Sequence, residues 1–523
     1  MPDWTYHPLS PLAAGLLGAS RSRRVALRLL ALLTALPGGT RLVAAFLGRF
    51  RPPTGLRVGA VVPVAHARDA LRVLPALGAT VIEVGPVGSH QVPAVRAALA
   101  GRRCEVIVRA EAPDVAAALG PDVDRVVTGP EPDLVHLNQN DPDDCSVERA
   151  VAALADPAAT VLATTDLLVA TGPGWFRRVM EAATPTEPAQ RWQNLRRNPL
   201  RWPSWAWGVL VGLGMIGAGM AAAAITLGPL LLWYDSDYLG ATRDDLHELN
   251  HHLVHFLQHD RITLAGTMVS IGILYTGLAW GGIRHGWLWA RDAYLISGAV
   301  GLPTVFYFLG TGFVEPFHTA LTAVLFPLLL LTVWRSPARP RWSIQPDAPE
   351  PLRRRALTGQ LLMILTGTGL LIGGATISVV GLTRVFVPTD LVFLGADAAH
   401  LHAAGPHLIP FIAHDRAGFG GALLSAAIAI ILISAWGWRR GASWVWWTLL
   451  LAAAFGFGPT IVIHHLIHYT DAMHLAPVYA GTVLTTAALT LARPYLCSPT
   501  SPTDLGQDDI GRYATADAGT APV

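Results

Sequence analysis

The sequence has 523 residues, of which 52% are hydrophobic and only 14% are charged, and its mean hydropathy is +0.41. This composition excludes an ordinary soluble multidomain protein, so part of the chain must be embedded in a membrane. All 38 basic residues are arginines, which excludes chemistry that needs a lysine amine, such as a Schiff base or a Walker-type phosphate site. Because of its apolar composition, the first expected partner of the chain is the lipid bilayer. No nucleic-acid partner is expected.

Residues 1–50 are predicted to form short amphipathic helices that lie on the membrane surface. Arg21, Arg23 and Arg24 precede an apolar stretch from Val25, as they would in a signal peptide. No small-residue cleavage site follows before the next polar turn, so we interpret the segment as part of the protein.

From residue 51 to residue 184, short β-branched stretches alternate with helical ones. This pattern indicates βα units around a parallel sheet. The segment is too short for a complete (β/α)8 barrel, which takes about 250 residues. The predicted strands are 58–64, 80–87, 105–109, 125–128, 134–137 and 160–169.

Three stretches of the N-terminal third resemble one enzyme family. They are Tyr6-His7-Pro8-Leu9 to Leu36-Pro37-Gly38, Ala70-Leu71 to Gly85-Pro86-Val87, and Gly172-Pro173-Gly174-Trp175-Phe176-Arg177-Arg178. In order, they are similar to the N-terminal helical region, the first βα unit with the second strand, and the start of the last helix of class 2 dihydroorotate dehydrogenases. The resemblance implies a membrane-associated, quinone-linked flavin barrel, here in shortened form.

The resemblance places the flavin-contacting lysine of that family on His66, and it implies that Gly172 and Gly174 border the cofactor. The asparagine-rich orotate motif and the Ser or Cys base of the family have no counterpart here. An FMN enzyme needs a cationic group for the phosphate and a base over the substrate. We therefore expect a degenerate domain that binds no FMN and acts as a docking or regulatory module. A working flavin- or quinone-linked oxidoreductase is the alternative, and a plain polar loop residue is the alternative for His66.

Residues 185–204 form a basic juxtamembrane linker that leads into aromatic residues and a long apolar stretch, the expected order at a cytoplasmic membrane surface. Eight spans are predicted in two groups, which occupy residues 205–334 and 357–495. Residues 335–356 link the groups, and the tail 496–523 is predicted to be disordered. The spans are placed near 205–233, 262–283, 288–312, 317–334, 357–383, 417–438, 444–466 and 473–492. Arginine-rich joints alternate with acidic ones, which predicts a multi-pass plasma-membrane protein with both termini in the cytoplasm.

The second group of spans repeats the first at an offset of 155 to 156 residues. His259-Asp260-Arg261 matches His414-Asp415-Arg416, and Glu315-Pro316-Phe317-His318 matches Asp471-Ala472-Met473-His474. Because the period contains an even number of spans, we predict two parallel four-helix repeats. The predicted fold is thus a multi-pass α-helical membrane protein with an N-terminal cytoplasmic α/β domain that resembles a truncated flavin barrel.

The repeated polar residues fall at one depth, on the extracytoplasmic face, where 14 of the 19 histidines are expected to gather. A carboxylate and a histidine three residues apart share a helix face, and imidazole suits copper, zinc or haem iron. His464 and His468 occur only in the second copy and are the expected added ligand pair. The candidate ligands are His259, His318, His414, His464, His468, His474, Glu315 and Asp471.

Three other interpretations stay open. Asp260 and Asp415 suit N-cap positions and Glu315 and Asp471 suit first turns, so these residues could simply stabilise helix starts. Ionisable groups at membrane depth also suit proton or anion handling. A transporter ranks last, because the spans carry almost no ionisable group near their midplane. A quinone and a protein are the further partners considered.

Overall fold

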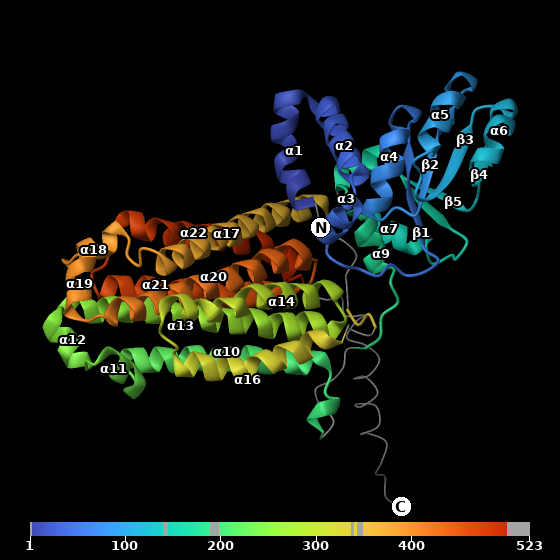
Figure 1. Cartoon of the computed structure of the whole chain (residues 1–523). Coiled ribbons are helices and arrows are strands. Elements are labelled where there is room, and N and C mark those ends of the chain that lie inside the picture. The colour runs from blue at the N-terminus through green and yellow to red at the C-terminus, as the bar shows by residue number, and fades with distance from the viewer. Residues whose placement is uncertain (1–2, 140–144, 189–197, 336–338, 343–348, 499–523) are drawn as a thin grey trace, which may run out of the picture.

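The structure is a computed structural model that describes residues 3–139, 145–188, 198–335, 339–342 and 349–498. Residues 189–197 of the juxtamembrane linker, parts of the linker 335–356 and residues 499–523 of the predicted tail lie outside the described residues. The fold has two parts, an N-terminal α/β domain and a bundle of long apolar helices, and the α/β domain sits at one end of the bundle (Figure 1).

The α/β domain is built on six parallel strands in the order β4-β3-β2-β1-β6-β5. The sequence pattern predicts all six. The last strand is shorter than predicted, because the Thr164 hydroxyl caps a helix that follows it at once, α8 (Thr165–Thr171). The strands are β1 (Arg57–Val62), β2 (Val81–Val87), β3 (Glu105–Ala110), β4 (Arg125–Val127), β5 (Leu134–Leu137) and β6 (Thr160–Ala163).

The sheet curls into a half-barrel. Each strand sends one apolar side chain into a common interior layer, and the edge strands β4 and β5 are drawn together by ion pairs from Arg125 to Glu131 and Asp133. Helices α4 (Val64–Leu77), α5 (Val92–Leu99), α6 (Pro113–Leu119), α7 (Ser146–Ala153) and α9 (Trp175–Ala182) follow strands or lie against the sheet. The interior layer consists of Val61, Val81, Ile107, Val127, Leu134 and Leu162.

Residues 1–50 are helical where they are described, in α1 (Asp3–Leu17), α2 (Ala19–Ala35) and α3 (Gly39–Leu47). In Figure 1 α1 and α2 stand side by side, across the direction of the bundle helices. Their outer faces expose large apolar side chains, including Leu12, Leu16, Leu29 and Leu32. Contact of this face with a membrane surface stays a prediction.

Eight helices of the described chain are long and apolar enough to cross a membrane, and each corresponds to one predicted span, so the chain is a membrane protein. The spans are Ser204–Leu227 (α10), His251–His285 (α13 and its continuation), Leu288–Thr311 (α14 and its continuation), Pro316–Trp334 (α16), Glu350–Leu382 (α17), Leu408–Gly437 (α20), Ser443–Leu466 (α21) and Ala472–Leu496 (α22). Four short helices, α11 (Trp233–Leu239), α12 (Arg243–Leu249), α18 (Pro388–Leu394) and α19 (Ala398–Ala404), lie at the end of the bundle far from the α/β domain (Figure 1).

Two spans begin earlier than the sequence pattern predicts. Helix α13 starts at residue 251 rather than 262, because the Asn250 side chain caps it by accepting a hydrogen bond from the His252 amide at 2.9 Å. Helix α20 likewise starts at residue 408 rather than 417. Asp260 and Asp415 therefore lie inside helices, and the prediction that they are N-caps is wrong.

Helices of the two halves pair off at an offset close to 155 residues, with one exception. Helix α21 is continuous over Ser443–Leu466, whereas its counterpart α14 (Leu288–Gly301) gives way to 3-10 turns over Leu302–Tyr307 and then to α15 (Phe308–Thr311). This break matters for the space around α16, as described below.

Buried ion pairs fix the α/β domain to the bundle. Glu181 of α9 accepts hydrogen bonds from Arg439 at 2.8 Å and from Arg177 at 2.7 Å. Burial alone would raise the pKa of the Glu181 carboxyl, but the two guanidiniums lower it to about 2. Asp3 of α1 similarly meets Arg353 of α17 at 3.0 Å. The two parts are thus joined by buried ion pairs at two places.

Candidate metal centre

The two repeated His-Asp-Arg triplets lie in contact across the bundle. Arg261 of α13 donates its Nε hydrogen to Asp415 of α20 at 2.9 Å, and Arg416 of α20 donates to Asp260 of α13 at 3.0 Å. The pairing is reciprocal, so each half of the bundle supplies one guanidinium and one carboxylate to the other.

Each of these arginines reaches a second carboxylate on a short helix. Arg261 lies 3.3 Å from Asp235 of α11, and Arg416 forms an ion pair with Asp390 of α18. All four carboxylates are at most 4% exposed. Among the described residues, then, four buried carboxylates share two guanidiniums, and burial raises the pKa of the Asp235 carboxyl. Buried charge must be compensated, so this region favours the uptake of protons or of a cation.

Next to this ion-pair network, three histidines converge. His259 comes from α13, His464 from the last turn of α21, and His474 from the first turn of α22. Their ligand atoms all lie within 4.8 Å of one another, and the first two imidazoles are buried. The imidazoles of His259 and His464 are in direct contact, with ring centroids 4.3 Å apart, which leaves no room for a porphyrin between them.

Hydrogen bonds fix the orientation of the rings. His259 Nδ1 lies 2.9 Å from Asp260, and His464 Nδ1 lies 2.6 Å from the Thr460 carbonyl oxygen, so both Nδ1 atoms must donate. Tyr469 donates its hydroxyl hydrogen to Asp390 at 2.8 Å, and its oxygen accepts from His474 Nδ1 at 3.3 Å. Partners of this kind on the far ring nitrogen are what orient histidine ligands around a metal.

The remaining ring nitrogens face one another. With Nδ1 as the donor on both rings, the Nε2 atoms of His259 and His464 each carry a lone pair, and they lie only 2.9 Å apart. Two lone pairs at this distance repel, and a proton or a metal ion between them removes the repulsion. In a tetrahedral site with metal–nitrogen bonds of about 2.0–2.1 Å, the nitrogens lie about 3.4 Å apart. Small side-chain shifts would therefore reach metal geometry.

Two of the predicted ligands lie outside the cluster. Helix α21 ends at Leu466, and His468 adopts a left-handed conformation, with φ of +60°, that turns the chain back. His468 is exposed and no longer shares a helix face with His464. Asp471 is also exposed and caps α22 by accepting a hydrogen bond from the His474 amide at 2.8 Å.

The other three predicted ligands form a second group at the matching place in the other half of the bundle. The rings of His318 of α16 and His414 of α20 lie 5.7 Å apart, close to the 5.8 Å between His259 and His474. Glu315 caps α16 at the His318 amide and lies 3.6 Å from His318 Nδ1. A third imidazole is missing here, since the position that matches His464 is a leucine.

Three residues are assigned to a flavin site by the resemblance. His66 lies half-buried in the first turn of α4, whereas Gly172 and Gly174 lie next to the carboxylate of Asp3. The Gly174 amide donates to Asp3 at 2.8 Å, and a Cβ atom at Gly172 or Gly174 would come within 2.7 Å of the Asp3 carboxylate. A carboxylate thus occupies the place where the resemblance puts the cofactor.

Sequence reasoning missed several polar side chains. At the carboxyl end of the half-barrel, Glu83 accepts hydrogen bonds from Arg109 at 2.6 Å and lies 2.9 Å from His136 Nε2. Burial raises the pKa of the Glu83 carboxyl, but these two neighbours outweigh burial and lower it. Inward-facing positions of strands could have revealed this network. Tyr469 gave no comparable signal, because its role depends on the turn at residue 468.

Geometry is the only guide to what these groups do. The three-histidine cluster combines fixed rings, opposed lone pairs and a surplus of buried acid, and these features suit a cation. Comparison of the chain with protein-family models, with curated proteins and with solved structures gives no match.

Proposed function

We propose that this chain is a membrane protein whose helical bundle binds one transition-metal ion through His259, His464 and His474. The observation that carries the proposal is that each of the three imidazoles uses Nδ1 for a hydrogen bond within the protein. Nε2 is then the free nitrogen of each ring, and the ligand atoms gather within 4.8 Å. Neutral imidazole is the ligand that copper and zinc share.

The charge around the site suits a cation of this kind. Four carboxylates but only two guanidiniums are buried beside the imidazoles. A divalent ion would therefore compensate negative charge that the protein itself leaves unbalanced. Three protein ligands leave a fourth position open, as in zinc sites that bind water or substrate rather than serve structure alone. We therefore favour an accessible metal over a structural one.

We also infer that the bundle arose as two parallel four-helix repeats. The offset of the triplets, the reciprocal arginine pairs and the matching left-handed residues Leu230 and Val385 support this inference. The centre would then draw one ligand from the first repeat and two from the second. By the positive-inside rule, it lies on the extracytoplasmic side of a plasma membrane, with both termini in the cytoplasm.

The α/β domain is proposed to be a docking module that binds no flavin. Asp3 fills the space beside Gly172 and Gly174, and Glu83 with Arg109 fills the carboxyl end of the half-barrel. Its buried ion pairs with the bundle favour a fixed attachment. A flavin-linked oxidoreductase, the alternative, would need these groups to give way to the cofactor phosphate.

Metal analysis of detergent-purified protein tests the proposal. We expect close to one equivalent of zinc or copper in the wild type and its loss in His464→Gln. The matched control is His465→Gln, because His465 is the next residue on the same helix but is exposed and contacts Tyr479 instead. Metal that persists in His464→Gln, or a wild-type protein that takes up neither ion on dialysis against it, would overturn the proposal.

A further inference from the structure

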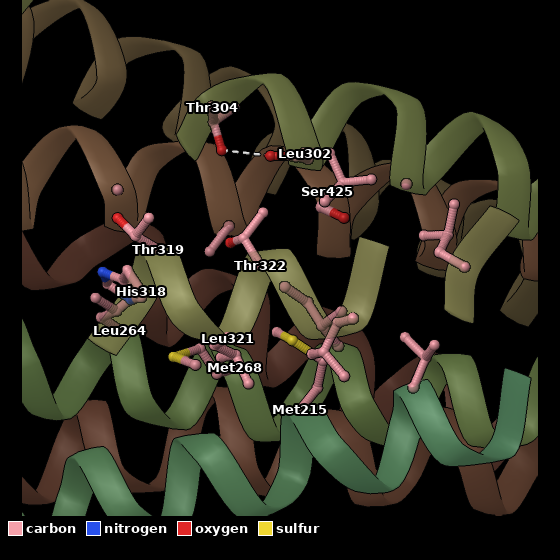
Figure 2. Close-up of a pocket in the computed structure, with 18 of the residues that line it drawn as sticks. Met215, Leu264, Met268, Leu302, Thr304, His318, Thr319, Leu321, Thr322 and Ser425 are labelled. Atoms are coloured by element: carbon pink, nitrogen blue, oxygen red, sulfur yellow. Dashed lines mark hydrogen bonds between the residues drawn. The ribbon is translucent and has the colours of Figure 1, made fainter. Parts of the chain in front are cut away.

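A cavity of about 150 Å³ lies beside the second histidine group, within the bundle. Its walls come from α10, α13, α14, α16 and α20. Figure 2 shows Met215 and Met268 on one side of it, Thr322 and Ser425 on the other, and His318 toward one end. It is distinct from the three-histidine cluster, whose members do not line it.

The cavity is long and mostly apolar. Its lining on α16 runs from Glu315 to Leu329, which spans about 21 Å at 1.5 Å per residue. Met215, Met268 and Leu325 line the wall, and such flexible or aliphatic side chains adapt to hydrocarbon. The dimensions suit a single extended chain, not a compact polar solute.

The end of the cavity near α15 is polar, and one of its groups has no partner. His414 is 7% exposed and lines the cavity, and its Nε2 atom makes no hydrogen bond. A buried polar atom without a partner costs free energy unless a ligand or water supplies one. Glu315 and His318 line the same end, and the Glu315 carboxylate accepts a hydrogen bond from Tyr234.

The break in the third helix explains why this half is open. In the second half α21 runs on to Leu466 and presents His464 to its neighbours. In the first half the helix yields to turns over Leu302–Tyr307, and Thr304 and Tyr307 line the cavity. The second half of the bundle is thus closed around three histidines, whereas the first half has two histidines and an open cavity.

We propose that this cavity binds a lipophilic molecule with one apolar chain and an uncharged, hydrogen-bonding head, which His414 contacts. The carboxylate of Glu315 at the polar end disfavours an anionic head through like-charge repulsion. An isoprenoid quinone and a neutral single-chain glycerolipid share this chemistry. The inference does not depend on a metal at the other site.

Native mass spectrometry of the full-length protein in detergent can test this, with decylubiquinone, monoolein and oleate as added probes. We expect at least one neutral probe to bind more tightly than oleate. Binding of decylubiquinone alone would identify the ligand as a quinone, and binding of monoolein alone would identify it as a glycerolipid. Oleate binding as tight as that of the better neutral probe would refute the uncharged-head proposal.

Two phenylalanine variants test the location of the binding site, and a third variant tests the contact of the head with His414. Thr322→Phe fills the middle of the cavity and should abolish binding, whereas Thr490→Phe, the same change on an exposed face of α22, should not. His414→Leu should weaken the neutral probe about fivefold, the effect of one lost hydrogen bond. Equal binding by both phenylalanine variants would overturn the proposal. Metal content, measured on the same samples, should stay at the wild-type level in all three variants, so failure here is distinct from failure of the metal site.

Discussion

Replacing Arg416 by methionine tests whether the crossed ion pairs hold the two halves of the bundle together. The guanidinium is 7% exposed and pairs with Asp260 and Asp390, of which Asp390 is completely buried. The substitution keeps most of the apolar stem but leaves two carboxylates without their cation. Breaking one partner out of a buried pair costs about 3–5 kcal/mol, and we expect a loss of unfolding free energy in that range.

The assay is unfolding of the detergent-purified protein with increasing SDS, followed by circular dichroism. Arg384→Met is the control, because Arg384 is exposed on the turn after α17. Adding Asp390→Asn to Arg416→Met should restore part of the stability, since a neutral amide is less costly to bury than an unpaired carboxylate. A loss below about 1 kcal/mol in Arg416→Met, with no recovery in the double variant, would refute the reasoning.

Three further outcomes are expected. Asp260→Asn should weaken metal binding about 10–100-fold, because a neutral amide replaces the carboxylate that accepts the hydrogen bond from His259 Nδ1. Asp415→Asn, which breaks the matching ion pair, should affect metal binding much less, and competition with a chelator measures both. The Glu181 carboxyl has its pKa lowered from 4.5 to about 2, so its contribution, on the order of 3 kcal/mol, is complete above pH 4.5 and is lost as the pH falls toward 2. Glu181→Gln should therefore remove the pH dependence of the stability of the α/β domain attachment over this interval. Limited proteolysis of the intact chain at several pH values measures it. Purified protein should show no flavin absorption, even after incubation with FMN, and a bound flavin would restore the enzyme interpretation.

Hydrophobic pattern alone located the large elements. Six β-branched stretches became six strands, and eight apolar stretches became eight long helices, because burial in a sheet or a membrane demands that composition. The pattern failed where polar residues continue a helix. His251 to Arg261 are too polar to resemble a span, yet they are helical, since Asn250 caps the helix and Asp260 and Arg261 are paired across the bundle.

The sequence indicates which histidines are candidate ligands, but not which of them lie together in the structure. Internal repetition singled out His259, His414, His318 and His474, and the asymmetry between copies singled out His464. Which of them meet depends on how α13 packs against α21 and α22, and α20 against α16, and sequence periodicity carries no information on that. His468 was a reasonable choice by helical spacing, but the helix ends two residues before it.

The attachment of the α/β domain constrains how the protein can be made. Arg353 and Arg439, which neutralise Asp3 and Glu181, belong to the second half of the bundle. The ribosome reaches Arg439 roughly 250 residues after the α/β domain is complete, about 10–50 s later at ordinary elongation rates. During that interval each carboxylate has only the cation of its own domain, Arg178 for Asp3 and Arg177 for Glu181, and lacks its second partner from the bundle. We therefore expect the domain to complete its attachment to the bundle only after Arg439 has been synthesised.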